Sequence, residues 1–419
     1  MSRLRELIDE LCPDGVGFKK LGCFCECFSG ATPKKSNSTY WEDGTIPWMS
    51  SGEVHQHVVT HVNGRITQAG YDSCSTRMVP AGTVVVALAG QGKTRGTVAI
   101  TDIELCTNQS IGAILCDETV DSKYLYYYLS AQYDYLRRIS SGEGTRGGLN
   151  MPLLRNLDIP VPPVEVQREV VRILDSFQEL DDALTAEIEA REKQYSLLSE
   201  RLLSQEYLEA AAGVTIVQKP LKEIALVGSS KRVLKRDLVD SGIPFFRGTE
   251  VGLLSEGNPI DPQLFLTEET YASVVSASGR PLVGDLLLPS VNEAGKVWMV
   301  DTDDAFYLKD ARVLWVHTGS AKEEVDCRYM RYALSKSLVD NYRLLASGAQ
   351  FAELKISSLE TAPILLPPVD VQSMVADKLD DARALLQDRT IGLPAERDAR
   401  RKQFEHYRDK LLSFPVKEA

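Results

Sequence analysis

A six-residue phrase occurs twice in this sequence, and each copy precedes a long segment with helical periodicity. Pro-Pro-Val-Glu-Val-Gln occupies 162–167, and Pro-Pro-Val-Asp-Val-Gln occupies 367–372, 205 positions later. Proline suits the start of a helix, where its missing N–H costs no hydrogen bond. An acidic residue there interacts favourably with the positive end of the helix dipole. Each copy therefore predicts the beginning of a helix.

Apolar residues recur after each copy at steps of mostly three and four, as on one face of a helix. The stripe over 170–202 predicts a helix of roughly 40 residues, about 60 Å long at 1.5 Å per residue. A second stripe covers 375–411. We expect the two stripes to be buried on each other. Gly392 and Pro394 interrupt the second stripe and predict a kink or a break, because proline inside a helix removes a hydrogen bond.

The segments before the two helices also align with each other. Ile46-Pro47-Trp48 corresponds to Ile243-Pro244-Phe245, and 149–167 corresponds to 354–372 without a gap. The chain is therefore two copies of one unit, each about 160 residues of mixed structure followed by a long helix. We expect a first domain at 1–160, a long helix at 161–213, a second domain at 214–366 and another long helix at 367–419.

Each domain is predicted to be mainly β. Short apolar runs bounded by Gly and Pro predict strands: Thr83–Leu88, Ile111–Cys116, Leu286–Leu288 and Ala311–Val316. One helix is predicted in each domain, at Lys123–Ile139 and Arg328–Leu345. The expected fold class is α+β, with two repeated mainly-β domains separated by a pair of long helices. Two glycine-rich loops, Ala89–Gly96 and Ser140–Gly148, favour a binding surface.

Composition describes an ordinary globular protein in a reducing compartment. No apolar run approaches the ~18 residues of a membrane span, and the polar N-terminus is unlike a secretory signal. Eight cysteines without such a signal predict free thiols and a cytoplasmic location. The net charge of −12 argues against nucleic acid only at first sight. Residues 161–213 carry 12 acids against 5 bases, so each near-neutral domain can still have a local basic face.

Two patterns imitate chemical sites. Ala87–Thr94 has a relaxed phosphate-loop spacing, but 95–100 is predicted to be a strand where nucleotide binding needs a helix. A loop that carries Lys93 and Arg95 toward a partner's phosphates, or a solvated turn, is the favoured interpretation. Cys23, Cys25 and Cys27 alternate as on one face of a strand and are expected to be core side chains rather than metal ligands. A solvent-facing strand explains the histidines at 55, 57 and 61.

Motifs for catalysis are missing from the sequence. It lacks the Asn-Pro-Pro-aromatic tetrapeptide of base-amino methylation and a glycine-rich loop opening a helix for adenosylmethionine. No histidine is placed beside a serine or cysteine nucleophile. We expect a non-catalytic protein that needs no cofactor and no metal.

The order of several short motifs resembles one family. Gly30-Ala31-Thr32-Pro33, Tyr40-Trp41, Ile46-Pro47-Trp48-Met49, Gly82 with a glycine-spaced basic loop, and Pro162-Pro163 opening a long helix are duplicated in order. In this the chain resembles the DNA-specificity subunit of type I restriction-modification systems. The second copy departs at its start, where Gly228-Ser229-Ser230-Lys231 replaces Gly-x-Thr-Pro.

The resemblance implies two target-recognition domains that each recognise one half of a split sequence in double-stranded DNA. It also implies that a pair of antiparallel helices, a coiled coil, acts as a spacer and docks two methyltransferase subunits. Restriction subunits join the same assembly. Two other classes stay open: a fused methyltransferase or nuclease, and a protein-only scaffold whose β domains bind peptides or polysaccharide.

The candidate DNA contacts are polar and basic residues of the predicted loops, because Arg and Lys can bond guanine or phosphate and Asn and Gln can bond adenine. They are Lys34, Lys35, Lys93, Arg95 and Arg146 in the first domain, and Lys231, Arg232, Arg247, Asn292, Lys296 and Gln350 in the second. The densest basic cluster is Lys231-Arg232 with Lys235-Arg236. For each residue a solvated surface charge is the alternative.

Overall fold

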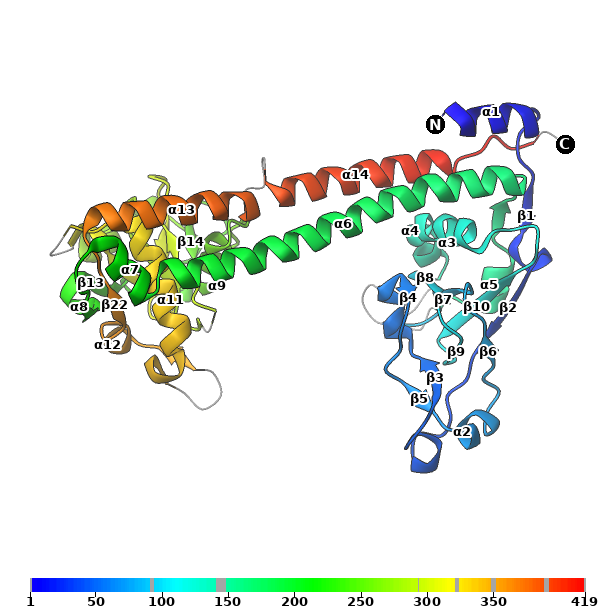
Figure 1. The fold of residues 1–419 in the computed structure, drawn as a ribbon, viewed down its shortest axis with the longest axis horizontal. Coiled ribbons are helices and arrows are strands. Elements are labelled where there is room, and N and C mark those ends of the chain that lie inside the picture. Colours follow the sequence, from blue (N-terminus) through cyan, green and yellow to red (C-terminus); the bar gives the residue numbers. More distant parts are fainter. Residues whose placement is uncertain are drawn as a thin grey trace. The chain divides into compact units, whose positions relative to one another are not determined.

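The computed structural model describes residues 2–90, 94–140, 148–292, 294–320, 324–347, 352–387 and 392–417. The chain divides into two compact units (Figure 1). Unit 1 comprises Met1–Asp182 and Arg400–Ala419, and unit 2 comprises Ala183–Ala399. Helix α6 (Val164–Leu202) is 39 residues long, which confirms the predicted length. Its first half belongs to unit 1 and its second half to unit 2.

Unit 1 is built on two sheets whose strands are mostly buried. The larger sheet has the order β2-β10-β7-β8-β4 and the smaller one β5-β3-β9-β6, with a separate pair β1-β11. Their bounds are β1 (Phe18–Lys20), β2 (Cys25–Ser29), β3 (Ile46–Met49), β4 (Val58–Val59), β5 (Arg65–Ile66), β6 (Met78–Val79), β7 (Val84–Ala87), β8 (Val98–Thr101), β9 (Leu105–Thr107), β10 (Ile111–Cys116) and β11 (Asp158–Pro160). All four residues of β7 are buried, as a continuous apolar run predicts.

The helices of unit 1 are α1 (Ser2–Leu11), α2 (Gln68–Asp72), α3 (Ser122–Ala131), α4 (Tyr133–Ile139), α5 (Met151–Arg155) and the end of α14 (Leu393–Leu411). They contact different parts of its sheets, with α3 and α5 on the larger sheet and α2 beside β5. Helix α3 packs against β7 and β8. The single helix predicted at 123–139 is two helices, because the chain leaves helical geometry at Gln132. The two ends of the chain meet in this unit, where the Val16 N–H donates to the Pro415 carbonyl at 2.8 Å.

Unit 2 repeats the arrangement. Its sheets have the orders β13-β19-β16-β17 and β15-β14-β18, with the pairs β12-β22 and β20-β21. The strands are β12 (Gln218–Pro220), β13 (Leu226–Ser229), β14 (Ile243–Phe246), β15 (Phe265–Leu266), β16 (Leu286–Pro289), β17 (Trp298–Met299), β18 (Tyr307–Leu308), β19 (Val313–His317), β20 (Ala346–Ser347), β21 (Glu353–Leu354) and β22 (Pro363–Leu365). The helices are α7 (Gln205–Ala212), α8 (Leu221–Ile224), α9 (Gly248–Ser255), α10 (Glu268–Ser278), α11 (Cys327–Leu345), α12 (Ile356–Leu359) and α13 (Val369–Gln387).

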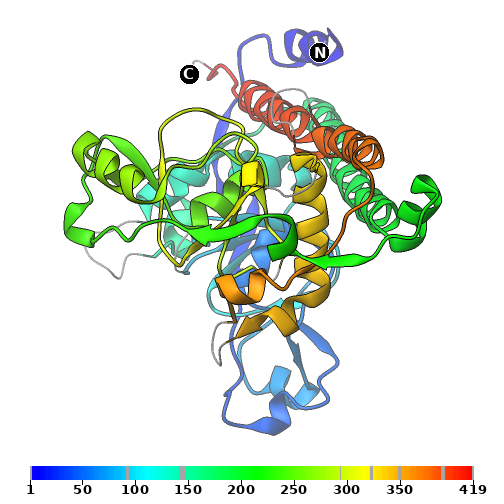
Figure 2. The ribbon, with the colours of Figure 1, turned by 90° about the vertical axis from the view of Figure 1, so that its left-hand side faces the viewer.

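Strand pairing confirms the internal repeat. Strand β10 lies between β2 and β7, and β19 lies between β13 and β16, all antiparallel. In the smaller sheets β3 pairs parallel with β9, as β14 does with β18. Helix α11 is the counterpart of α3 in unit 2 and packs against α13. It is the gold helix in Figure 2. The α+β fold with two repeated domains and a long helix is thus the observed one.

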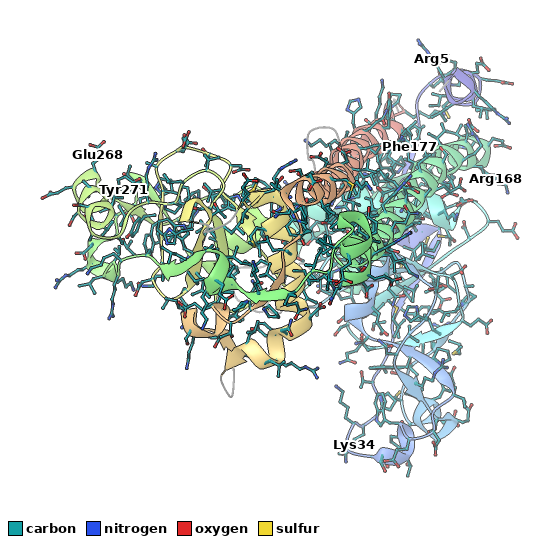
Figure 3. The ribbon with its side chains drawn as sticks, turned by 60° about the vertical axis from the view of Figure 1, so that its left-hand side comes forward. Arg5, Lys34, Arg168, Phe177, Glu268 and Tyr271 are labelled. Carbon is teal, nitrogen blue, oxygen red and sulfur yellow. The ribbon has the colours of Figure 1, made fainter. Side chains whose placement is uncertain are left out.

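Apolar faces of the long helices are covered within each unit. In unit 1, Phe177 of α6, labelled in Figure 3, stacks on Tyr407 of α14 with ring centroids 5.6 Å apart. The Phe404 ring lies edge-on to Phe177 at 6.3 Å. In unit 2, Tyr195 and Leu198 of α6 pack against the core cluster that contains Leu379 of α13. The stripes therefore contribute to the two cores.

The C-terminal segment contains two helices. Helix α13 ends at Gln387 and α14 begins at Leu393, directly after Gly392. Proline 394 stands in the first turn of α14, where a missing N–H is tolerated. The predicted interruption is therefore present. Likewise, α6 stops at Leu202, and the Ser204 side chain accepts the Tyr207 N–H to cap α7.

Two predictions about local structure are wrong. Cys23 lies in the 3-10 helix η1 (Leu21–Cys23) and is exposed, so only Cys25 and Cys27 are buried on β2. None of the three histidines lies in a strand, although β4 (Val58–Val59) lies between His57 and His61. Ser50 and Glu53 form a capping box that starts the 3-10 helix η3 (Ser51–Gln56). His55 lies in η3, and His57 follows it at φ 61°.

The part of the chain with described coordinates contains no helix long and apolar enough to cross a membrane. Within those same residues, no three or more His, Cys, Asp or Glu side chains are grouped as metal ligands.

Candidate nucleic-acid interface

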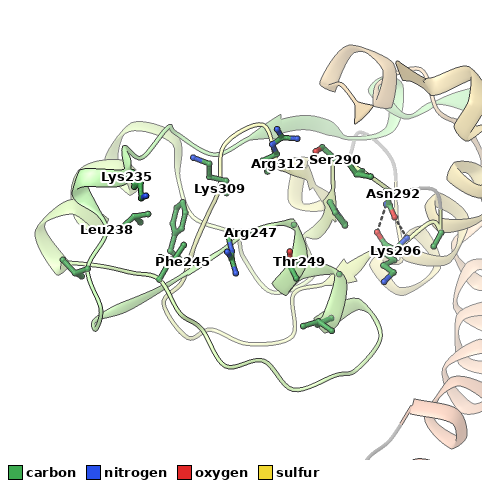
Figure 4. A pocket seen from close by; sticks show the side chains of 18 of the residues that line it. Lys235, Leu238, Phe245, Arg247, Thr249, Ser290, Asn292, Lys296, Lys309 and Arg312 are labelled. Atoms are coloured by element: carbon green, nitrogen blue, oxygen red, sulfur yellow. Dashed lines mark hydrogen bonds between the residues drawn. The ribbon is translucent and has the colours of Figure 1, made fainter. Parts of the chain in front are cut away.

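An open groove of about 1060 Å³ lies in unit 2, and basic side chains dominate its charged lining (Figure 4). The groove has one acidic lining residue, Asp240, and a partly apolar wall that includes Leu238 and Phe245. Its basic lining residues are Lys235, Arg247, Lys296, Lys309 and Arg312. We call these five the groove cations. A concave lining with five basic side chains and one acidic side chain favours an anionic partner.

Sheet topology explains why cations from distant parts of the sequence meet here. Strands β14 and β18 are parallel, so their carboxyl ends lie at the same edge of the sheet. Arg247 directly follows β14, and Lys309 directly follows β18. The Lys309 N–H donates to the Phe246 carbonyl at 2.8 Å, which holds the two strand ends together.

Arg247 is held by a buried carboxylate. It precedes α9, and Glu250 in the first turn accepts the Arg247 backbone N–H at 2.9 Å. The same carboxylate accepts the guanidinium through Nη2 at 2.5 Å and through Nε at 3.2 Å. Burial alone would raise the pKa of Glu250, but the hydrogen bonds from Arg247 hold that pKa below its usual value. The hydrogen bond to Glu250 in turn raises the pKa of Arg247.

Three of the other groove cations, Lys296, Lys309 and Arg312, have carboxylate neighbours that are more exposed than Glu250. Lys296 Nζ lies 2.6 Å from Glu256, and Lys309 Nζ lies 3.5 Å from Asp310. Arg312 forms an ion pair with Glu353. Exposed pairs of this kind contribute little free energy, so these cations can exchange their partners for phosphate at small cost.

Asn292 has a structural place in the groove wall. It is 2% exposed, and its side-chain amide donates to the Lys296 carbonyl at 2.8 Å while its oxygen accepts the Lys296 N–H at 2.6 Å. Both ends of the carboxamide are therefore occupied within the loop. The geometry supports a role in shaping the loop that presents Lys296.

Only part of the predicted basic cluster lines the groove. Lys235 is a lining residue, in the 3-10 helix η4 (Lys235–Asp237). Lys231 and Arg232 are exposed on the loop after β13, outside the groove lining. The Lys231 backbone N–H donates to the Tyr307 hydroxyl at 2.9 Å, which fixes that loop against β18.

Sequence reasoning missed Lys309 and Arg312. Both stand in the short connection between β18 and β19, where the chain turns at Ala311 with φ 56°. Their position directly after a strand that pairs in parallel with β14 is the signal that would have identified them. That pairing could not be derived from the sequence alone.

The predicted residues of unit 1 do not form an equivalent described groove. Lys34 and Lys35 are exposed on the loop before the 3-10 helix η2 (Ser38–Tyr40), and Figure 3 places Lys34 at the tip of unit 1 far from α6. Arg95 is half-buried in the turn before β8. Lys93, Arg146 and, in unit 2, Gln350 lie outside the described residues.

Unit 1 has uncharged residues where unit 2 has groove cations. Ser50 occupies the place of Arg247, since its N–H donates to Glu53 at 2.7 Å as that of Arg247 does to Glu250. Asn108 occupies the place of Lys309, since its N–H donates to the Met49 carbonyl at 3.0 Å. The same backbone frame therefore presents different side chains in the two units.

Comparison with known proteins gives consistent matches. The family profile described as "Type I restriction modification DNA specificity domain" matches residues 13–191. The MjaIX type I restriction enzyme specificity subunit of Methanocaldococcus jannaschii is 26% identical over 394 residues, covering 85% of this chain and 84% of that protein. The EcoR124I/EcoR124II specificity subunit of Escherichia coli is 29% identical over 195 residues, or 45% of this chain and 48% of that one.

A solved structure extends the likeness to the fold of nearly the whole chain. It comes from work on complex assembly and conformational transition of the type I restriction-modification system. The TM-score is 0.59 at 15% identity, and the match covers 95% of this chain and 97% of the other.

Proposed function

The chain belongs to the family of type I restriction-modification specificity subunits, non-catalytic proteins with a role in DNA target recognition, and we propose from this premise that it recognises a bipartite target in double-stranded DNA. Unit 1 would recognise one half of the target and unit 2 the other. A pair of related domains with different surface side chains suits two unlike half-sites.

The basic groove of unit 2 is the observation that carries the proposal. Five cations and one acid line it, in a chain whose net charge is −12. Basic side chains gathered on a concave lining support binding to a polyanion with release of counterions, when phosphate replaces the exposed carboxylate partners of Lys296, Lys309 and Arg312. Leu238, which is partly exposed in the groove wall, can also contact thymine methyl groups.

We further propose that the long helices act as a spacer and bind two methyltransferase subunits, with restriction subunits joining the same assembly in the cytoplasm. Support comes from the surface of α6. Leu180 in unit 1 and Leu197 in unit 2 are 50% and 58% exposed on this helix, so each unit leaves apolar area of α6 available to a partner. The 12 acids of 161–213 would favour partners with a complementary basic face.

Methylation mapping of the assembled complex tests this function. The full chain is produced with its methyltransferase subunits, and methylated positions are mapped on DNA of random sequence. We expect one split sequence to be methylated, and no adenosylmethionine turnover by the chain alone. Methylation without sequence preference would contradict target recognition. Absence of DNA binding in a shift assay would instead support a protein-only scaffold.

A further inference from the structure

We propose that Arg247 is the specificity-determining residue of the unit 2 groove and that it binds a guanine in the second half-site. The inference rests on the proposed function, because it identifies which groove cation contacts a base and which base it takes. It draws on the contrast between Arg247 and the other groove cations.

Base recognition needs a side chain whose direction is fixed before DNA arrives. Arginine binds guanine through two parallel N–H donors that reach O6 and N7, which only a held guanidinium presents in register. The Glu250 carboxylate holds the Nε and Nη2 side of the Arg247 guanidinium, at 3.2 Å and 2.5 Å. Among the described residues, Nη1 has no hydrogen-bond partner. The edge formed by Nη1–H and the second N–H of Nη2 is thus available to a base as a two-donor fork.

The Glu250 carboxylate, which holds the Arg247 guanidinium, is itself fixed. Glu250 is 7% exposed, and its carboxylate also accepts the backbone N–H of Arg247 as the capping box of α9. The Arg247 side chain is 46% exposed and lines the groove. A buried anchor with an exposed fork is the arrangement that keeps a guanidinium oriented while leaving its outer edge to solvent or ligand.

The other groove cations lack one of these features. Lys235, Lys296 and Lys309 carry single ammonium groups on flexible stems, which suits phosphate better than a two-donor contact. Arg312 has a planar fork, but its partner Glu353 is 37% exposed and stands on the short strand β21. These four residues are therefore assigned to phosphate contact, which positions the groove on DNA without selecting sequence.

The repeat provides a second, independent reason. Unit 1 keeps the same capping box but has Ser50 at this place, and Glu53 is occupied by the Ser50 hydroxyl at 3.0 Å and the Asn63 N–H at 2.8 Å. The two units share the capping box, but the side chain at its first position is a hydroxyl in unit 1 and a guanidinium in unit 2. A position of this kind distinguishes two half-sites without altering either fold.

The test measures base preference in the assembled complex of the full chain with its methyltransferase subunits. Selection from DNA with randomised half-sites gives the preference of each half separately. For Arg247→Ala we expect a loss of about 10- to 100-fold in preference at a single guanine of the second half-site, the size of one bidentate contact. Preference in the first half-site should stay as in the parent complex.

Two further variants separate base contact from charge and folding. Arg247→Lys keeps the charge but loses the fork, so the guanine preference should fall while the salt dependence of binding stays the same. Lys309→Ala is the matched control, in which affinity should fall for all sequences, the salt slope should decrease by about 0.9, and the guanine preference should remain. Melting temperatures of the variants report any loss of fold.

The outcomes also distinguish this inference from the proposed function. If Arg247→Ala lowers affinity equally for every second half-site, or Arg247→Lys keeps the full guanine preference, Arg247 contacts phosphate and the inference is wrong. If the parent complex itself shows no preference in either half-site, the proposed function fails.

Discussion

The buried side-chain oxygen of Gln167 accepts a hydrogen bond from the backbone N–H of Asp121 at 2.8 Å. In the second copy Gln372 accepts the N–H of Asp326 at 2.9 Å. Each glutamine also donates to the carbonyl of the first proline of its own phrase, at 2.8 Å and 2.7 Å. The last residue of the duplicated phrase thus fastens the start of a long helix to the residue that caps α3 or α11.

Replacing Gln167 by leucine should destabilise unit 1. The change leaves the Asp121 N–H and the Pro162 carbonyl buried without a partner, which costs about 1–3 kcal/mol for each such group. Thermal unfolding and hydrogen exchange across α3 would measure the effect. Gln178→Leu is the matched control, since Gln178 is exposed on the same helix and hydrogen-bonds only Asp182 among the described residues. Equal melting temperatures for the two variants would contradict the prediction.

Lys231 and Arg232 provide a test of the phosphate contacts outside the groove. Because both are exposed on the loop that Tyr307 anchors, the double change to alanine should weaken DNA binding. The slope of log affinity against log salt should become shallower by roughly one unit per lost phosphate contact. Binding titrations at several salt concentrations measure this slope, with Lys19→Ala/Lys20→Ala on β1 as the control pair. An unchanged slope would identify the two residues as solvated charges.

The spacer role predicts that the length of α6 sets the gap between half-sites. Four residues inserted after Ile188 would lengthen the helix by roughly 6 Å, and they rotate it by only about 40° beyond a full turn. We expect the gap to grow by about one or two base pairs at 3.4 Å each, with the bases of both half-sites unchanged. Mapping of methylation sites for the assembled variant measures the gap.

If the original spacing persists in that variant, the helices serve only as a docking surface. The same conclusion would follow if the bases changed while the gap stayed constant, because the insertion lies outside every recognition loop.

Cysteine alkylation tests the placement of Cys23 in η1, outside β2, and the burial of Cys27 on β2. Burial raises the pKa of the Cys27 thiol to about 11, so roughly one molecule in a thousand carries the thiolate at pH 8. Cys23 is exposed in η1, although it lies only four residues away. Iodoacetamide at pH 8 followed by peptide mass spectrometry should label Cys23 at least about 10-fold faster than Cys27. Denaturation should bring the two rates together, because it removes the burial of Cys27. Similar rates already in the native protein would contradict this placement.

The duplicated phrase, the helical stripes and the buried apolar runs determined the architecture from the sequence. These signals are local, because a stripe at steps of three and four reports one helix and a run such as Ile111–Cys116 reports one buried strand. The repeat then added the relation between the two halves. Local signals failed where capping decided the outcome, as at Ser50 and Glu53, whose capping box places His55 in a 3-10 helix instead of a strand.

Tertiary structure alone decided which polar residues meet. The parallel pairing of β14 with β18 brings Arg247 and Lys309 to one groove, and no sequence spacing reports that pairing. Burial separated Asn292, whose carboxamide is used inside its loop, from Arg247, whose guanidinium is held but still exposed. A side chain's type shows what it can bind. Its partners and exposure, which depend on residues far along the chain, determine whether it is free to do so.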